Sequence, residues 1–173
     1  MLLYFVPFQH LSHIMIDQNT FWDPASPKVP PLSDEFVQQA EQKLGVRLPH
    51  ELLALLKQQN GGYTRGFAFL TAKATSWSET HVPFDELFGL VLLPSDNGPA
   101  SILDTEYLTQ EWGLPEKQVL LSGDGHWFIT LDYRNGPIPS VAWIDTDMEQ
   151  DVQLADNFGT FLAGLVDGDS VEE

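Results

Sequence analysis

Residues 33–62 read SDEFVQQAEQKLGVRLPHELLALLKQQNGG and predict two short helices in succession. Ser33 suits the N-cap of the first helix, whose apolar side chains fall on one face, and Gly45 suits its end. Pro49 is preorganised for the start of the second helix, which is rich in leucine and stops before an Asn-Gly-Gly run. We therefore expect a helical hairpin from Ser33 to Gln59.

The second half of the chain has the pattern of strands. Trp127 to Leu131 alternates between its two faces, and the Asn135-Gly136 pair after it predicts a turn. Val141 to Asp145 can then return as the partner strand. Nearer the middle, Leu87 to Leu93 is a short apolar run that fits a buried strand, although its periodicity does not exclude a helix.

Two further helices complete the expected fold. One is predicted from Ser101 to Trp112, and the other closes the chain from Phe158 to Leu165, where apolar residues recur at helical spacing. Helices first, an antiparallel meander later and a closing helix are typical of an α+β fold. We expect helices packed around a central, largely antiparallel sheet in a single domain of 173 residues.

Charge limits the classes of partner. Eight Lys and Arg residues against 25 Asp and Glu give a net charge of −17. Such a field repels nucleic acids and anionic membranes and attracts basic proteins. No Lys or Arg follows Arg134, whereas acidic residues continue to the end of the chain. We therefore expect a protein partner with a basic surface, and neither nucleic acid nor a membrane.

The chain has no cysteine, which excludes disulfides, thiolate zinc ligands and a cysteine nucleophile. The apolar N-terminus, Met1 to Ile16, has no Lys or Arg, is interrupted by Pro7 and lacks a signal-peptide cleavage site, so we expect it to belong to the fold. No other apolar run approaches the roughly 18 residues that span a bilayer. These features predict a soluble, cytoplasmic protein.

Four blocks of the sequence, in this order, resemble the SUKH superfamily, which includes the Smi/Knr cell-wall-assembly regulators. The blocks are Ala40 to Gly62, Phe84 to Leu90, Ser122 to Val141 and Leu154 to Leu162. The resemblance extends over about residues 22–165 and leaves residues 1–21 as an N-terminal extension.

The resemblance implies mixed helices on a central sheet and no shared catalytic residues. Many bacterial members look like immunity proteins that bind and neutralise a toxin, often a nuclease. It therefore implies a non-catalytic binding domain that masks a basic toxin. Two alternatives stay open: a regulatory or scaffold module with an endogenous protein partner, and a hydrolase whose carboxylates converge only in the fold.

Two groups of residues resemble metal sites but lack essential features. Asp145 to Asp156 has the acidic spacing of a calcium loop, but Gln150 stands where the loop needs glycine, and Asp156 replaces the bidentate glutamate. His10, His13 and Asp17 could share a helical face, but their apolar neighbours favour a structural role. We predict no metal and no cofactor.

His126, Asp124 and Ser122 offer a base, an acid and a hydroxyl within a short stretch. The members of a catalytic triad normally converge from separate segments, so this local group favours a turn. We predict no catalytic residue.

Four acidic residues are the candidate partner-facing residues: Asp145, Asp147, Glu149 and Asp151. They alternate directly after a predicted strand, which would place their carboxylates on one face with no following cation to neutralise them. A docking surface for a basic partner is the functional interpretation, and a solvated acidic loop is the simpler alternative.

The absence of cysteine and the defective calcium loop lead to a first prediction. Addition of a chelator should leave the midpoint of thermal unfolding unchanged at fixed pH and salt, because only a metal bound to the native state would contribute to its stability. A fall of several degrees would reveal a structural metal and contradict the prediction.

Overall fold

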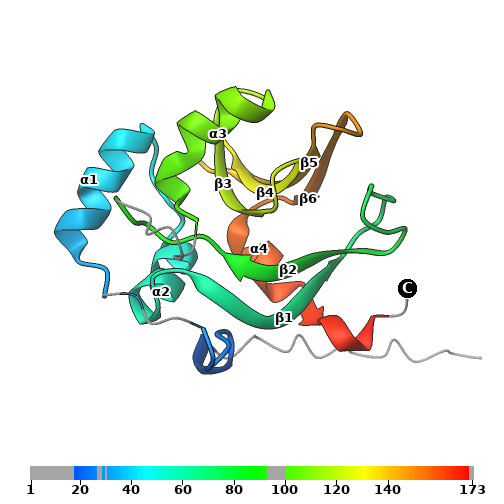
Figure 1. The fold of residues 1–173 in the computed structure, drawn as a ribbon, viewed down its shortest axis with the longest axis horizontal. Coiled ribbons are helices and arrows are strands. Elements are labelled where there is room, and N and C mark those ends of the chain that lie inside the picture. Colours follow the sequence, from blue (N-terminus) through cyan, green and yellow to red (C-terminus); the bar gives the residue numbers. More distant parts are fainter. Residues whose placement is uncertain (1–17, 27–28, 30, 93–99, 172–173) are drawn as a thin grey trace, which may run out of the picture.

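The computed structural model describes residues 18–26, 29, 31–92 and 100–171, which contain four α-helices and two antiparallel sheets (Figure 1). The helices are α1 (Asp34–Leu44), α2 (His50–Gln58), α3 (Thr105–Trp112) and α4 (Phe158–Ala163). Short 3₁₀ turns occupy Gln18–Thr20 (η1), Ile102–Asp104 (η2) and Gly168–Ser170 (η3). The expected α+β fold is confirmed.

The strands form one sheet of three and one of four. The first sheet has the order β2-β1-β7, with β1 at Gly62–Leu70, β2 at His81–Leu87 and β7 at Leu165–Asp167. The second is a meander of β3 (Gln118–Gly123), β4 (Trp127–Asp132), β5 (Ser140–Asp145) and β6 (Gln150–Ala155). Figure 1 shows α1 and α2 at one end of the molecule and the loop that joins β1 to β2 at the other.

The helical hairpin has the predicted ends. The Ser33 hydroxyl accepts a hydrogen bond from the Phe36 amide at 3.2 Å, and Gly45 ends α1 in the left-handed conformation with φ 72°. The next helix begins directly after Pro49. Ser33 and Gly45 therefore cap α1, Pro49 precedes the start of α2, and the leucines of both helices pack into the core.

The hairpin joins the sheets where two backbone segments cross. The Asn60 side chain donates to the Leu90 carbonyl at 2.9 Å and accepts from the Leu90 amide at 2.7 Å. A Cβ on Gly89 would lie 2.2 Å from the Asn60 carbonyl oxygen, and one on Gly61 would lie 2.5 Å from the Gly89 nitrogen. Only glycine fits at both positions of this crossing.

Two expected elements have different ends. Of the apolar run from Leu87 to Leu93, only Leu87 belongs to a strand, and Gly89 makes an isolated parallel bridge to Ser101; residue 93 lies outside the described residues. The closing helix stops at Ala163, because Leu165 pairs with Phe69 at the start of β7. Tertiary pairing with β1 overrides the helical spacing there.

The helix expected from Ser101 begins instead with the 3₁₀ turn η2. Ser101 caps this turn, since its hydroxyl accepts from the Leu103 amide at 3.1 Å. The α-helical part starts at Thr105 and ends at Trp112, as expected.

The N-terminal side of the fold includes a residue that we assigned to the extension. Phe21 is fully buried, stacks on Phe67 at 5.5 Å, and its carbonyl accepts from the Arg65 amide. Met1 to Ile16, and with them His10, His13 and Asp17, lie outside the described residues. Among the residues that the structure describes, no helix has the length and apolar character to cross a bilayer.

Asn60 supplies a prediction about stability. Asn60→Ala should lower the free energy of unfolding by about 2–4 kcal/mol, because it leaves the buried amide and carbonyl of Leu90 without partners. Chemical denaturation measures the loss, and Asn135→Ala, at an exposed position, is the control with a change within about 0.5 kcal/mol. Equal stability of the two variants would show that the crossing does not depend on Asn60.

Candidate functional site

The first of the four candidate acids, Asp145, is buried. Its side chain is 2% exposed, one carboxylate oxygen accepts from the Ser76 hydroxyl, and the other accepts from the Met148 amide at 3.0 Å. Asp145 pairs with Trp127 at the end of β5, so it shares the face of the sheet that carries Trp143. The expected exposed position of Asp145 is therefore wrong.

The last candidate acid, Asp151, is neutralised by a cation. Arg134 donates to its carboxylate at 2.6 and 3.0 Å and to the Asp132 carboxylate at 2.6 to 3.0 Å. These hydrogen bonds, first to Asp132 and then to Asp151, raise the pKa of the Arg134 guanidinium. The expectation that no basic residue lies near the acids is wrong, because β6 returns alongside β5 and brings Asp151 within reach of Arg134.

Asp147 and Glu149 are exposed, on the turn between β5 and β6. Met148 lies between them and is 62% exposed. Glu149 has φ 52°, a left-handed conformation that closes the turn. The turn thus presents two carboxylates on either side of a large apolar side chain.

A loop of the first sheet is fastened beside this turn. Residues 71–80 join β1 to β2, and the Ser76 amide donates to the Gln150 side chain at 2.6 Å. The Ser76 hydroxyl, which donates to Asp145, also accepts from the Trp143 ring nitrogen at 3.3 Å. Ser76 thereby holds the loop against the second sheet.

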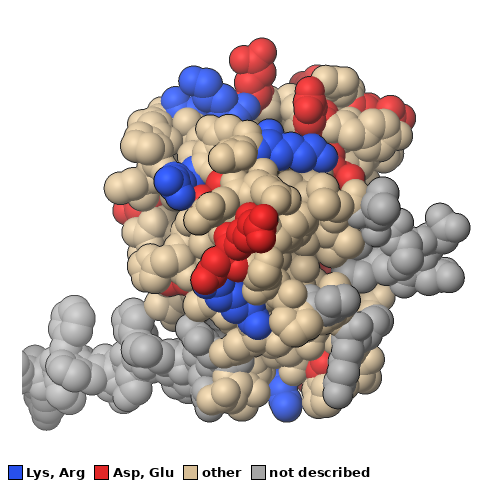
Figure 2. Space-filling view, turned by 90° about the vertical axis from the view of Figure 1, so that its left-hand side faces the viewer, with Lys and Arg blue, Asp and Glu red and all other residues tan. Residues whose placement is uncertain are grey.

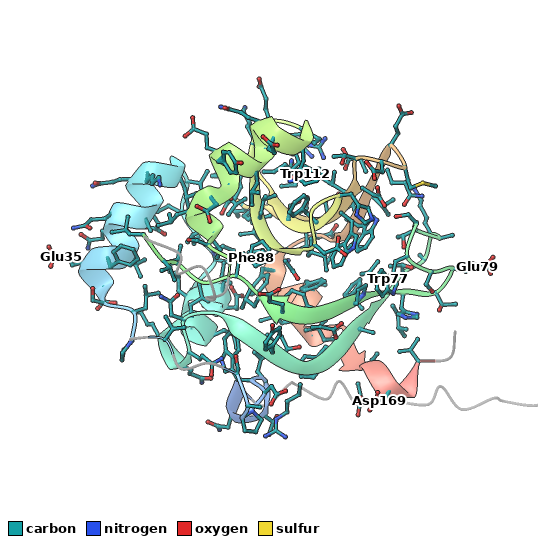
Figure 3. All side chains as sticks on the ribbon, in the orientation of Figure 1. Glu35, Trp77, Glu79, Phe88, Trp112 and Asp169 are labelled. Atoms are coloured by element: carbon teal, nitrogen blue, oxygen red, sulfur yellow. The ribbon has the colours of Figure 1, made fainter. Side chains whose placement is uncertain are left out.

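Trp77, the next residue, lies edge-on against Trp127 at 5.7 Å and remains 49% exposed. Figure 3 shows Trp77 and Glu79 on the same loop, with Glu79 at its outer edge. The two turns together form a surface with apolar residues among acids, which we call the turn surface. Its residues are Trp77, Glu79, Asp147, Met148 and Glu149.

Sequence reasoning found two members of the turn surface and missed the other three. Trp77 had a recognisable signal, since it stands in the stretch Thr75-Ser-Trp-Ser-Glu79 without an apolar neighbour to bury it. Lys73 is the basic residue of the two turns, against three acids. The turn surface is therefore acidic, with Trp77 and Met148 as apolar contacts for a partner.

A cleft of about 1170 Å³ lies elsewhere, between α1 and the second sheet. Its wall includes Arg47, whose guanidinium donates a hydrogen bond to the buried Glu41 carboxylate at 2.9 Å. The Tyr133 hydroxyl donates to the Arg47 carbonyl, and burial, followed by the Glu41 charge, raises the pKa of Tyr133. Tyr133 is thus a structural donor and does not supply a base.

Buried polar groups continue beneath the cleft as a chain of hydrogen bonds. Thr130 donates to the Gln118 side chain at 2.7 Å, and Gln118 donates to Asp132 at 2.9 Å. Burial alone would raise the pKa of Asp132, but hydrogen bonds from Arg134 and Gln118 outweigh it and hold that pKa below its ordinary value. The chain ends in ion pairs and stabilises the wall of the cleft.

No catalytic or metal arrangement emerges from the described ranges. His126 lies 3.5 Å from Asp124 in a turn, and Ser122 is buried in β3. Burial raises the pKa values of Asp85 and Glu86, but as neighbours on β2 they point to opposite faces of the strand. Across these same ranges, no three His, Asp or Glu side chains are grouped to hold a metal ion.

Comparison with known proteins identifies a family for this arrangement. The model of the SMI1 / KNR4 family (SUKH-1) matches residues 31–164, which is more than half of the chain. No curated protein matches the chain. The matched range contains the helical hairpin, both sheets except β7, and every residue of the turn surface.

The fastening of the loop by Ser76 can be tested by substitution. Ser76→Ala should lower the free energy of unfolding by about 1–3 kcal/mol, because the buried side chains of Asp145 and Trp143 lose a hydrogen-bond partner. Amide hydrogen exchange at Trp77 should become faster at the same time. Ser78→Ala is the matched control, since its hydroxyl bonds only residues of β2 and its own loop. Identical effects of the two substitutions would refute the role of Ser76.

Proposed function

The chain belongs to the SMI1 / KNR4 family (SUKH-1), and from that premise we propose that it is a non-catalytic domain whose turn surface binds a basic protein. The observation that carries the proposal is the exposure of Trp77 and Met148 among Glu79, Asp147 and Glu149. Aromatic and methionine side chains are enriched where proteins bind one another. Acidic groups around them complement a basic partner and steer its approach.

The proposed partner is a toxin domain, for which the chain serves as the immunity protein in the bacterial cytoplasm. A nuclease toxin needs a basic face to hold phosphates, and an acidic binder is complementary to that face. Binding there would mask the toxin sterically and electrostatically, without chemistry. The net charge of −17 and the turn surface both support this mechanism.

The partner can be identified by photocrosslinking from the turn surface. A photoreactive amino acid at Met148 should capture the partner in cells, whereas the same group at Tyr107, which is 64% exposed on α3 and lies in neither the turn surface nor the cleft, is the control. Expression of the captured protein alone should arrest growth, and co-expression of the chain should restore it. A captured partner that does not affect growth would favour a regulatory or scaffold role over immunity.

The turn surface makes a kinetic prediction for that partner. Asp147→Lys with Glu149→Lys should lower the association rate by about tenfold at low salt and change the lifetime of the complex less. The loss should shrink as salt rises, because screening weakens steering. Trp77→Ala should instead shorten the lifetime, since it removes an apolar contact.

The control carries the same change of charge elsewhere. Glu35→Lys with Asp169→Lys alters two exposed acids outside the turn surface, and Figure 3 shows Glu35 at the opposite end of the molecule from Trp77. Association rates that fall equally in both double variants would mean that net charge alone acts, and the turn surface would lose its proposed role.

A further inference from the structure

We propose that the cleft between α1 and the second sheet is a second binding site, which takes an acidic peptide segment of a partner protein. The site, called the basic cleft, is lined by the C-terminal half of α1, the α1–α2 connection, the start of β3 and the β4–β5 connection. It is separate from the turn surface and does not depend on the function proposed for that surface.

The first argument is the sign of the charge. Eight Lys and Arg residues occur in the chain, and three of them, Arg47, Lys117 and Arg134, line this one cleft. Glu41 is the acidic residue of the lining. Figure 2, which looks onto the end that carries α1, shows Lys and Arg side chains in its upper half with Asp and Glu side chains among them. Because Arg47 and Arg134 are held in ion pairs with Glu41, Asp132 and Asp151, Lys117 is the cation of the lining that is left to favour a negatively charged segment.

The second argument is the availability of one cation. The Glu41 carboxylate accepts hydrogen bonds from Arg47 and from the Leu48 amide. Arg134 forms ion pairs with the Asp132 and Asp151 carboxylates. In the described part of the chain, Lys117 makes no ion pair, and its side chain is exposed. Lys117 holds a left-handed backbone with φ 59°, and its carbonyl accepts from the Tyr133 amide at 2.9 Å. The fold therefore fixes the backbone of Lys117 at the cleft, with its ammonium group free of ion pairs to the described residues.

The third argument is the shape and lining of the cleft. At about 1170 Å³ and open to solvent, it exceeds the roughly 300–1,000 Å³ typical of small-molecule pockets. Apolar side chains of Leu44, Val46, Val119 and Pro137 lie among the cations, and Gln38, Gln42 and Asn135 add side-chain amides. Such a lining suits an extended peptide, with amides to bond its backbone and both apolar and cationic contacts for its side chains.

The negative charge elsewhere does not prevent this binding. The Debye length is about 8 Å at physiological ionic strength, so distant acids are screened from a ligand in the cleft. Strand β4 separates the two sites: Trp127 at its start contacts Trp77, and Tyr133 just after its end lines the cleft. At about 3.3 Å for each residue, the six residues of β4 place the sites about 20 Å apart.

The test is a titration of the isotopically labelled full chain, followed by nuclear magnetic resonance. The probe is a short capped peptide of alternating glutamate and leucine, and a lysine–leucine peptide of equal length is its counterpart. The acidic peptide should shift the amide signals of Arg47, Lys117 and Asn135, and the basic peptide should not. Shifts of the same signals by both peptides, or no shifts in the cleft, would overturn the proposal.

Variants assign the binding to the unpaired cation. Lys117→Glu should lower the affinity for the acidic peptide by about tenfold or more. Lys73→Glu makes the same change of charge outside the cleft and should lower that affinity by less than about twofold. Thermal unfolding verifies that both variants fold. Equal weakening would show non-specific attraction and reject the site. Asp147→Lys with Glu149→Lys should not lower the affinity for the acidic peptide. If the chain does not bind the acidic peptide, the proposal for the cleft fails and the proposal for the turn surface is unaffected.

Discussion

The crossing of the backbone at Asn60-Gly61 and Gly89-Leu90 is the constraint on which the rest of the structure depends. The Asn60 side chain satisfies both backbone groups of Leu90, and the two glycines allow the segments to approach closely. One residue earlier, the Phe88 amide donates to the Leu121 carbonyl at 2.7 Å and connects the first sheet to β3. Figure 3 shows Phe88 near the centre of the molecule, where the helical hairpin and both sheets meet.

Both candidate binding surfaces lie away from that centre and use residues that the core does not need. The turn surface is held by hydrogen bonds from Ser76 and the Met148 amide to the buried Asp145, while the side chains of Trp77 and Met148 remain exposed. The wall of the basic cleft is held by satisfied pairs, and Lys117 makes no ion pair with the residues that the structure describes. In each case a polar network beneath the surface fixes the backbone, so that the exposed side chains can differ without loss of the fold.

Local signals allowed much of the fold to be predicted. Ser33, Gly45 and Pro49 determine the helical hairpin through contacts within a few residues, and the alternation in β4 and β5 needs only the pleat of a strand. The position of Asp145 could not be predicted in this way. Its burial depends on Ser76, which is 69 residues away, and an acid at a strand end is by default exposed.

Neither the turn surface nor the basic cleft could be predicted from the sequence, and the reason is the same for both. The predicted alternation from Asp145 to Asp151 fails because residues 146–149 leave the strand to form a turn. The pairing of Arg134 with Asp151 requires β6 beside β5, and the cleft requires α1 beside the β4–β5 connection. These are tertiary contacts between distant segments, and no local pattern encodes them.

Trp77 and the two tryptophans packed behind it, Trp127 and Trp143, also give the protein an optical signature. Trp127 and Trp143 stack at 4.7 Å with an angle of 14° between their planes, and Trp77 meets Trp127 at 63°. Indole transitions coupled at such distances produce strong near-ultraviolet circular dichroism, and the half-exposed Trp77 emits at longer wavelength than the buried Trp143. A molecule that covers this loop would shift the emission to the blue, so the native chain can report its own occupancy without an attached dye.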